Sequence, residues 1–381
     1  MRSLRDKTIL LISPQSWGNM FLSKHHYAIE LAKRGNRVYF LNPPAEKNEQ
    51  FPEKIQIEAS TLQKNLFLIR HRLNFPYNIK FHFIRLFHML MKPHIKKILK
   101  KIESPVDIIW SFDLGNLYPF NFFPDNCLKI FHPVDEPLNE TAIHSAKGAQ
   151  MIFSVTHEIL EKYKQFNIPR HFINHGVAEE FLINVNKNHE EENHIHVGLS
   201  GNLLRTDIDR EIMLQIIREN PQMIFDCWGS YSLSQSNIGG GEDENTKSFI
   251  SNLQAQPNVS LHGVVSGPEL AKAIHRADAF LICYDVNKDQ SRGTNYHKVM
   301  EYLSTGKVIV SNNITTYRDC KELIQMVDER DNNRNLPGLF KKVLSELNYF
   351  NNASLQEKRI RFAQDSSYQR QVDRIEKIIY D

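Results

Sequence analysis

Short apolar runs alternate with amphipathic helical patterns from one end of this chain to the other. An apolar run at residues 8–13 is followed by a helical stripe at 21–33 and by a second run at 37–41. The stripe stops at Gly35, and glycine favours the left-handed conformation that ends many helices. This alternation predicts parallel strands joined by crossover helices. Further strands of the first half are predicted at residues 106–111, 128–131, 151–155 and 171–174.

The second half of the chain repeats the pattern. Its predicted strands span 196–200, 223–228, 259–261, 279–283 and 307–310, and its predicted helices span 210–219, 245–254, 268–276 and 295–305. A chain of 381 residues is long enough for two domains with separate cores. We therefore predict an α/β protein of two Rossmann-like, doubly wound parallel-sheet domains that face a cleft.

A polar stretch between the halves sets the expected domain limits. We expect an N-terminal domain at 1–180, a linker at 181–195 and a C-terminal domain at 196–364, because the linker has no apolar period and carries three consecutive glutamates. A last helix, at 365–381, is expected to return to the N-terminal domain. Ligands of doubly wound sheets bind at the carboxyl ends of the strands, so we expect the site between the domains.

The composition limits the classes of partner and the cellular compartment that we expect for this protein. The net charge of +3 is too small a bias to indicate a nucleic-acid partner. The four cysteines lie far apart without zinc-ligand spacing, which favours reduced thiols. No stretch approaches the roughly 18 uncharged apolar residues of a membrane span, and residues 1–13 lack the pattern of a signal peptide. We expect a cytoplasmic protein.

The stretch at 293–310 carries the most information about chemistry. A helix that begins near Thr294 or Asn295 places Lys298 in or near its first turn, where the helix dipole disfavours a cation. A bound phosphate would remove that conflict. Glu301 lies three residues on, on the same face, within reach of a sugar hydroxyl attached to that phosphate. An exposed ion pair on a surface helix would give the same spacing.

This stretch resembles the nucleotide-binding helix of the GT-B glycosyltransferases, of the group 1, family 4-like type. The matching residues are Lys298, Glu301, Tyr302, Leu303, Gly306, Lys307 and Val308. Three further stretches match in the same order, at 200–203, 257–264 and 277–281, and the resemblance covers nearly the whole chain. It implies that Lys298 lies near a diphosphate and that Glu301 holds a ribose.

The same resemblance implies the other contacts to a nucleotide-sugar donor. The family's arginine directly after the glycine of the first loop is Asn202 here, and Arg205 is the cation of that loop. A simple turn and a flexible polar loop are the alternatives at these positions. The expected donor-binding residues are Gly201, Asn202 and Arg205 at the diphosphate, Gly263 and Val264 at the nucleobase, and Arg292, Thr294 and Asn295 near the donor sugar.

The catalytic group is sought at the strand ends of the first half. Asp135 and His132 follow the predicted strand at 128–131, and either could deprotonate an acceptor hydroxyl in an inverting transfer. Asp135 could equally be a turn residue. Many retaining members of the family carry a glutamate eight residues before the ribose-binding one, where this chain has Gly293. The stereochemical outcome therefore stays open.

Acceptor contacts are expected from the first domain and no contact from a metal. Trp17, Gly18, His26 and Asp113 are the candidates on the acceptor side, although the tryptophan could be packing and Asp113 could cap a helix. The pair Asp207 and Asp209 resembles a metal-binding D-x-D pattern, but it stands at a helix start, where aspartate caps backbone amides. We expect neither an essential metal nor a separate cofactor.

Residues 78–101 are apolar and strongly basic, with seven lysines and arginines and no acid. Such a helix could lie on an anionic membrane surface. A core-packed helix with a solvated basic face, interrupted at Pro93, fits the same residues.

Together these features favour a hexosyltransferase that uses a nucleoside-diphosphate sugar and a sugar or lipid-linked acceptor in bacterial surface polysaccharide or glycolipid synthesis, at the inner membrane face or free in the cytoplasm. Two alternatives remain open. One is a sugar-nucleotide epimerase of the same fold, and the other is a non-catalytic nucleotide-sugar-binding protein, which Gly293 and Asn202 would suit.

Overall fold

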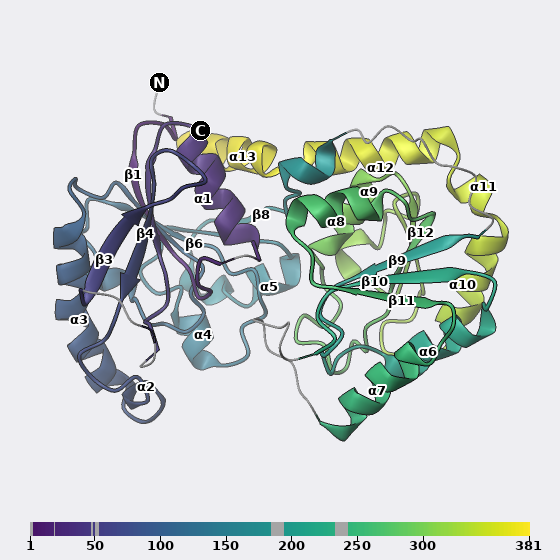
Figure 1. Cartoon of the computed structure of the whole chain (residues 1–381). Helices are drawn as coiled ribbons and strands as arrows, with labels where there is room; N and C mark the ends of the chain where they lie inside the picture. Colours follow the sequence, from purple (N-terminus) through teal and green to yellow (C-terminus); the bar gives the residue numbers. More distant parts are fainter. Residues whose placement is uncertain (1–2, 19, 47–48, 50–52, 184–193, 233–242) are drawn as a thin grey trace. The chain divides into compact units, whose positions relative to one another are not determined.

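A computed structural model of the chain describes residues 3–18, 20–46, 49, 53–183, 194–232 and 243–381. The chain forms two compact units, Met1–Asn174 with Tyr368–Asp381, and His175–Ser367 (Figure 1). Residues 175–180, which we expected in the N-terminal domain, fall in the second unit. Residues 184–193 of the predicted linker lie outside the described residues. All four cysteines are free.

The first unit is built on an eight-stranded sheet in the order β3-β4-β2-β1-β5-β6-β7-β8. The pairs are parallel except at one edge, where β3 runs antiparallel to β4. This hairpin was not predicted. β3 alternates apolar and polar residues and is mostly half-buried, so it lacks a continuous apolar run, whereas the apolar run at residues 66–69 of β4 is a strand signal that the sequence analysis missed. The strands are β1 (Thr8–Ile12), β2 (Arg37–Leu41), β3 (Ile55–Ala59), β4 (Leu66–His71), β5 (Ile108–Ser111), β6 (Leu128–Phe131), β7 (Met151–Ser154) and β8 (Arg170–Phe172).

Helices cover this sheet, and the last helix of the chain is one of them. They are α1 (Ser23–Lys33), α2 (Ile79–His82), α3 (Ile84–Lys101), α4 (Glu140–His144), α5 (His157–Glu161) and α13 (Tyr368–Tyr380). In Figure 1 α13 lies beside α1. Arg34, which caps α1, pairs with Asp373 at 2.6 Å and with Glu376 at 2.9 Å. These ion pairs join the C-terminal helix to the first unit.

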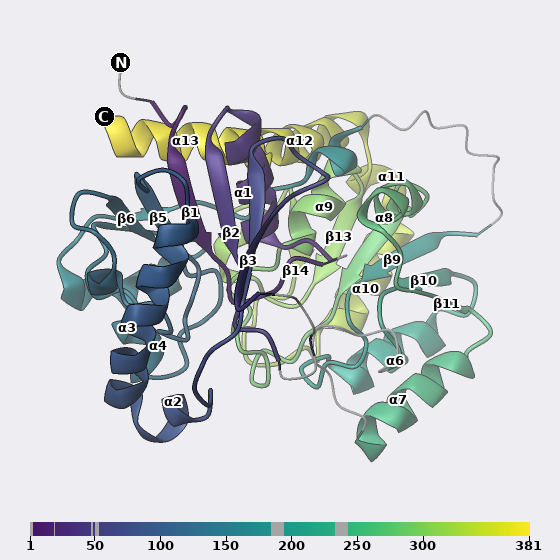
Figure 2. The same cartoon turned by 60° about the vertical axis from the view of Figure 1, so that its left-hand side comes forward.

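The basic stretch forms α2 and the long α3, which lie together in the first unit (Figure 2). α3 continues through Pro93, so the interruption predicted there is wrong. Phe87, Met91 and Ile95 are buried on both sides of the proline, and this packing outweighs the one backbone hydrogen bond that proline cannot make. In the part of the chain that the structure describes, no helix is long and apolar enough to cross a membrane.

The second unit has a six-stranded, fully parallel sheet in the order β11-β10-β9-β12-β13-β14. Its strands are β9 (His196–Ser200), β10 (Ile224–Trp228), β11 (Val259–Gly263), β12 (Ala279–Ile282), β13 (Val308–Ser311) and β14 (Ile324–Met326). Its helices are α6 (Arg210–Glu219), α7 (Glu244–Gln254), α8 (Gly267–Ile274), α9 (Lys298–Ser304), α10 (Leu336–Ser345), α11 (Leu347–Phe350) and α12 (Ala353–Asp365). The predicted doubly wound α/β architecture is confirmed in both units.

Candidate functional site

The carboxyl end of β9 is the centre of the candidate site. β9 lies between β10 and β12, where the strand order of the sheet reverses. Gly201 follows the strand with φ of 135°, and a Cβ atom there would lie 2.6 Å from Nζ of Lys298. A Cβ atom on the neighbouring Gly229 would lie 1.9 Å from the carbonyl oxygen of Gly201. Both positions therefore require glycine, and the backbone of Gly201 lies directly beside the lysine.

Lys298 is the first residue of α9 and is only 8% exposed. Its Nζ donates to the hydroxyl of Tyr284 at 2.7 Å and to the carbonyl oxygen of Ser200. Burial by itself lowers the pKa of Lys298, but the interactions with Tyr284 and Tyr302 outweigh burial and raise it. The ammonium is therefore charged and fixed in place at the end of β9.

The start of α9 differs from the prediction. The helix begins at Lys298 and its N-cap residue is His297, without a side-chain cap, so neither Thr294 nor Asn295 caps it. The carbonyl oxygen of Thr294 accepts hydrogen bonds from the backbone and the hydroxyl of Thr316, at 3.1 and 2.5 Å. These bonds tie the preceding turn to another loop, which keeps residue 294 out of the helix.

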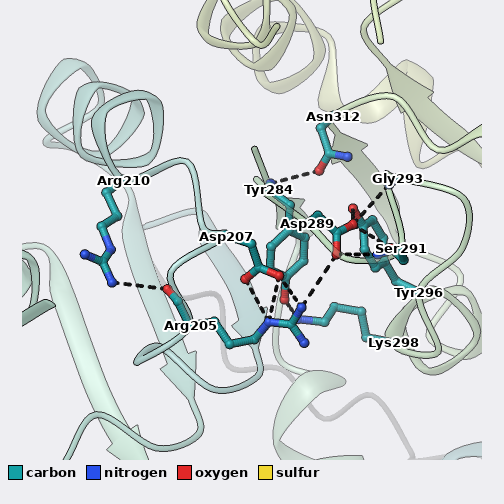
Figure 3. Close-up of polar contacts among 10 residues, drawn as sticks. All are labelled: Arg205, Asp207, Arg210, Tyr284, Asp289, Ser291, Gly293, Tyr296, Lys298 and Asn312. Carbon is teal, nitrogen blue, oxygen red and sulfur yellow. Dashed lines mark hydrogen bonds and ion pairs between the residues drawn. The ribbon is translucent and has the colours of Figure 1, made fainter. Parts of the chain in front are cut away.

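Arg205 approaches the same tyrosine from the loop after β9. Its guanidinium carbon lies 5.6 Å from the centre of the Tyr284 ring, and Nζ of Lys298 lies 5.0 Å from it. Figure 3 shows the two cations converging from opposite sides. Nε of Arg205 donates to the buried Asp207 at 2.8 Å, and Nη2 lies 3.6 Å from Asp289. The arginine side chain is 45% exposed, so it can still meet a ligand.

Asp289 organises the loop between β12 and α9. Its carboxylate accepts hydrogen bonds from the backbone of Ser291 and Gly293, from the Ser291 hydroxyl and from the Tyr296 hydroxyl. Gly293 has φ of 66°, and a Cβ atom there would lie 2.7 Å from the carbonyl oxygen of Asn313. Position 293, at which many retaining GT-B glycosyltransferases carry a glutamate, therefore has no room for any side chain in this loop.

Tyr284 and Asp289 were not predicted as site residues. Tyr284 stands just past the end of β12, next to β9 in the sheet, so a search for polar residues at strand ends would have found it. Asp289 gives no such signal. It lies within an irregular loop, and only the folded loop shows that its carboxylate is buried.

Glu301 lies one turn after Lys298 and is half-buried. Burial raises the pKa of its carboxyl to about 7; the nearby Lys298 opposes that rise and Glu180 adds to it. Within the described part of the chain, no hydrogen bond reaches this carboxylate. It is thus an acceptor that a bound diol could satisfy.

The remaining predicted donor residues are Gly263, Val264, Asn202 and Arg292. The Gly263 carbonyl oxygen accepts from the backbone of Gly229 at 2.7 Å, which places Gly263 and the 41% exposed Val264 beside the glycine pair. The side-chain oxygen of Asn202 accepts a hydrogen bond from the backbone N–H of Leu204 at 2.9 Å, within the same loop. Arg292 is exposed, and in the described chain nothing links its side chain to Lys298 or Arg205.

In the first unit, His132 and Asp135 follow β6 as predicted, but in different environments. His132 is fully buried, and burial followed by the charge of Lys24 lowers its pKa to about 3. Nε1 of Trp110 donates to Nδ1 of His132 at 3.3 Å, so the neutral ring carries its proton on Nε2. That nitrogen is a donor and is unsuited to act as a base. Asp135 is exposed.

Most of the predicted acceptor-side residues make backbone and packing contacts within the first unit. Both oxygens of the buried Asp113 accept from the backbone, one from Gly115 and one from Leu117, each at 2.7 Å. Trp17 packs edge-on against Phe40, and His26 stacks on Tyr368. Gly18 is exposed, with open space around it.

The two acids of the D-x-D pattern point to separate partners. Asp207 binds Arg205, and Asp209 caps α6 by accepting from the backbone of Ile212 at 3.3 Å. Among the described residues, no group of three or more histidine, cysteine or acidic side chains is placed to hold a metal ion.

Comparison with known proteins adds the fold. No protein-family model and no curated protein sequence matches this chain. Among solved structures, sucrose-phosphate synthase from Thermosynechococcus elongatus is similar with a TM-score of 0.73 and 13% identity, over 98% of each chain. HepE from Anabaena, in complex with UDP and glucose, has a TM-score of 0.66 and 11% identity, over 98% of this chain and 99% of the other. A glycosyltransferase from Rickettsia africae has a TM-score of 0.62 and 14% identity, over 98% and 97%. The chain therefore has the GT-B glycosyltransferase fold.

Proposed function

We propose that this protein is a glycosyltransferase that transfers a sugar from a nucleoside-diphosphate-sugar donor to an acceptor. The observation that carries the proposal is the pair of cations, Lys298 and Arg205, held against Tyr284 beside the side-chain-free backbone of Gly201. A diphosphate needs this combination of positive charge and close backbone approach. The similarity to HepE, whose structure holds UDP and glucose, supports a nucleotide-sugar ligand.

The donor roles follow from the contacts in the second unit. Lys298 and Arg205 would stabilise the charge that develops on the departing diphosphate, a role that a metal ion can fill in other transferases. Glu301 would accept hydrogen bonds from the ribose hydroxyls, which its unsatisfied carboxylate can do. Gly263 and Val264 would border the nucleobase. We propose a hexosyl group as the sugar and no essential metal.

We place the acceptor on the first unit, with Asp135 as the general base. Asp135 is exposed and follows β6, at the ligand-binding edge of the sheet. His132 drops out of that role because its free ring nitrogen carries a proton. Asp113 drops out because backbone amides already occupy both of its oxygens.

A thermal-shift panel with UDP, GDP, dTDP, CDP and CMP, with and without magnesium, tests the donor site. A ligand at a hundred times its dissociation constant should stabilise the fold by about 2.7 kcal/mol. We expect a selective response to one diphosphate that does not need magnesium. No response to any of the five would refute the donor site.

Product analysis then separates transfer from the two alternatives. The nucleotide sugar identified by the panel is incubated with and without candidate sugar and lipid-linked acceptors. Release of free nucleoside diphosphate with a glycosylated acceptor supports transfer. An epimerised nucleotide sugar in the absence of acceptor would identify an epimerase, and binding without turnover across the acceptor panel would favour a binding protein.

We further propose that α2 and α3 rest on an anionic membrane at the cytoplasmic face, where a lipid-linked acceptor would be presented. Phe81, Phe83 and Met89 are 69%, 65% and 64% exposed. α3 also carries exposed basic side chains, at Arg85, Lys92, Lys96, Lys97, Lys100 and Lys101. Apolar side chains that can insert, flanked by lysines, suit a peripheral membrane contact.

Cosedimentation with vesicles that contain phosphatidylglycerol tests this contact. The double variant Phe81→Ser and Phe83→Ser should lose most of the binding, whereas Tyr349→Ser, which removes a similarly exposed aromatic side chain from the second unit, should bind like the parent chain. Absence of binding by the parent chain at low salt would end the membrane proposal.

A further inference from the structure

Lys24 is a buried cation that the donor site does not use. It lies in the first turn of α1 and is 2% exposed. In the described part of the chain, its Nζ has no hydrogen bond and no ion pair. Burial lowers the pKa of Lys24 to about 8, although the charge of Asp135 opposes that shift. A desolvated ammonium without an acceptor destabilises a fold unless a ligand supplies one.

His132 lacks the same kind of partner. Because Trp110 occupies Nδ1, the proton of the ring is on Nε2, and this atom is buried without a hydrogen-bond partner in the described chain. Buried donors are almost always satisfied in folded proteins. His132 is therefore a second buried donor, and the described residues provide no acceptor for its Nε2–H group.

The two donors belong to one place in the first unit. Tyr27 lies one turn after Lys24 on the same face of α1, and its ring centre lies 5.2 Å from that of His132, so this face of α1 packs against His132. In line with this packing, the charge of Lys24 acts on His132, and the charge of Asp135, three residues after His132, acts on Lys24. α1 follows β1, which lies between β2 and β5 where the strand order of this sheet reverses, and His132 follows β6 on the far side of β5. This edge of a doubly wound sheet is where ligands bind.

We propose that Lys24 and His132 form an oxyanion subsite in the first unit, which takes a phosphate or carboxylate group of the ligand bound there. An oxyanion offers several acceptor lone pairs, so it can satisfy the lysine and the imidazole N–H together. The exposed Asp135 lies close enough to limit the net charge but makes no hydrogen bond to Lys24. The inference rests on the proposed function and extends it: the sugar or acceptor that binds at the first unit should carry a negatively charged group.

Calorimetric titration of the full chain tests the subsite with glucose 6-phosphate, glucuronate and glucose at constant ionic strength. We expect the chain to bind at least one of the two anionic sugars at least about tenfold more tightly than glucose. A preference for glucose 6-phosphate would indicate a phosphate ligand, and a preference for glucuronate a carboxylate. Equal binding of all three sugars, or no binding of either anionic sugar, would overturn the proposal.

Matched variants locate the effect. Lys24→Met should abolish the preference for anionic sugars, and Lys33→Met, which removes an exposed lysine from the other end of the same helix, should keep it. Lys298→Met should also keep it, because that lysine belongs to the second unit. If the preference followed Lys298 instead, the anion would be bound at the donor site and the subsite would be wrong.

The subsite and the donor site can fail separately. A chain that ignores every nucleotide in the thermal-shift panel but selects anionic sugars would retain the subsite and lose the proposed transferase. Should Lys24→Met fail to fold, the comparison of the three sugars on the parent chain still decides the proposal.

Discussion

Each unit buries a lysine in the first turn of a helix, and the two lysines have opposite surroundings. Lys298 donates to the hydroxyl of Tyr284 and to the carbonyl oxygen of Ser200, and its pKa is raised. Lys24 has no such acceptor in the described chain, and its pKa falls to about 8. Since both are almost fully buried, the acceptors decide the difference rather than the burial. The second unit fixes its cation before a ligand arrives, whereas the first unit leaves its cation for a ligand to complete.

The largest expected effect comes from the glycine pair that supports Lys298. Gly229→Ala would place a methyl group 1.9 Å from the carbonyl oxygen of Gly201, in a backbone conformation with φ of 132°. We expect a loss of about 3 kcal/mol or more in the free energy of unfolding, because backbone atoms must move to relieve the clash. Chemical denaturation measures it.

Gly338→Ala is the matched control for that variant. This glycine lies within α10, and nothing lies within 4 Å of the position that an alanine methyl group would take. Alanine should therefore leave stability unchanged or raise it by up to about 1 kcal/mol. Similar losses in both variants would show that the contact between the glycines does not set the stability of the site.

The second prediction removes the fixed cation itself. Lys298→Met should weaken binding of the nucleoside diphosphate by about tenfold to hundredfold, because a charge-assisted contact to phosphate is lost. Calorimetry on parent and variant measures the change. Lys307→Met is a suitable control, since this half-buried lysine of the same motif lies 3.6 Å from Asp278, at the opposite end of the strands. An unchanged affinity in Lys298→Met would remove the lysine from the donor site.

The third prediction concerns the protonation of Glu301, which should make nucleotide affinity at the donor site depend on pH. With a pKa of about 7, this carboxyl is mostly protonated at about pH 6 and mostly ionised at about pH 8. If the carboxylate accepts the ribose hydroxyls, nucleotide affinity should rise several-fold over that interval. Glu301→Gln should lose this part of the pH dependence and keep only the part that comes from the phosphate of the ligand. Parallel pH profiles for parent and variant would contradict the ribose role.

Sequence patterns predicted the architecture and singled out Lys298 and Arg205, but they indicated neither Lys24 nor the contacts that give the two buried lysines different pKa values. Lys298, Arg205 and Gly201 could be found because strand ends and motif spacing mark them. Asp289 could not, since its role arises from a loop that folds around its carboxylate. The state of His132 depends on the donor from Trp110, a residue of a neighbouring strand. Local sequence carries no information on such a cross-strand pair, so it suggested a base where the fold provides a donor.

The smallest expected effect is the loss of folding stability that the buried charge of Lys24 causes. It also tests the comparison of the two lysines most directly. Its pKa is lowered from an ordinary value of 10.5 to about 8 in the folded chain. Between about pH 8 and pH 10.5 the unfolded chain therefore holds the proton more tightly than the folded chain, so the free energy of unfolding rises with pH in that window. Below it, the desolvated charge destabilises the fold in full. Lys24→Met should accordingly be more stable than the parent chain by about 1 kcal/mol at neutral pH, and the advantage should shrink as the pH approaches 10.

Chemical denaturation of both chains across this range, with Lys33→Met as the exposed control, measures the difference. A variant that is less stable than its parent at neutral pH, or an advantage that does not change with pH, would mean that the folded chain already satisfies the amine. The contrast with Lys298 would then disappear. If the advantage is present, a bound oxyanion should reduce it, because the ligand supplies to Lys24 what Tyr284 and Ser200 supply to Lys298.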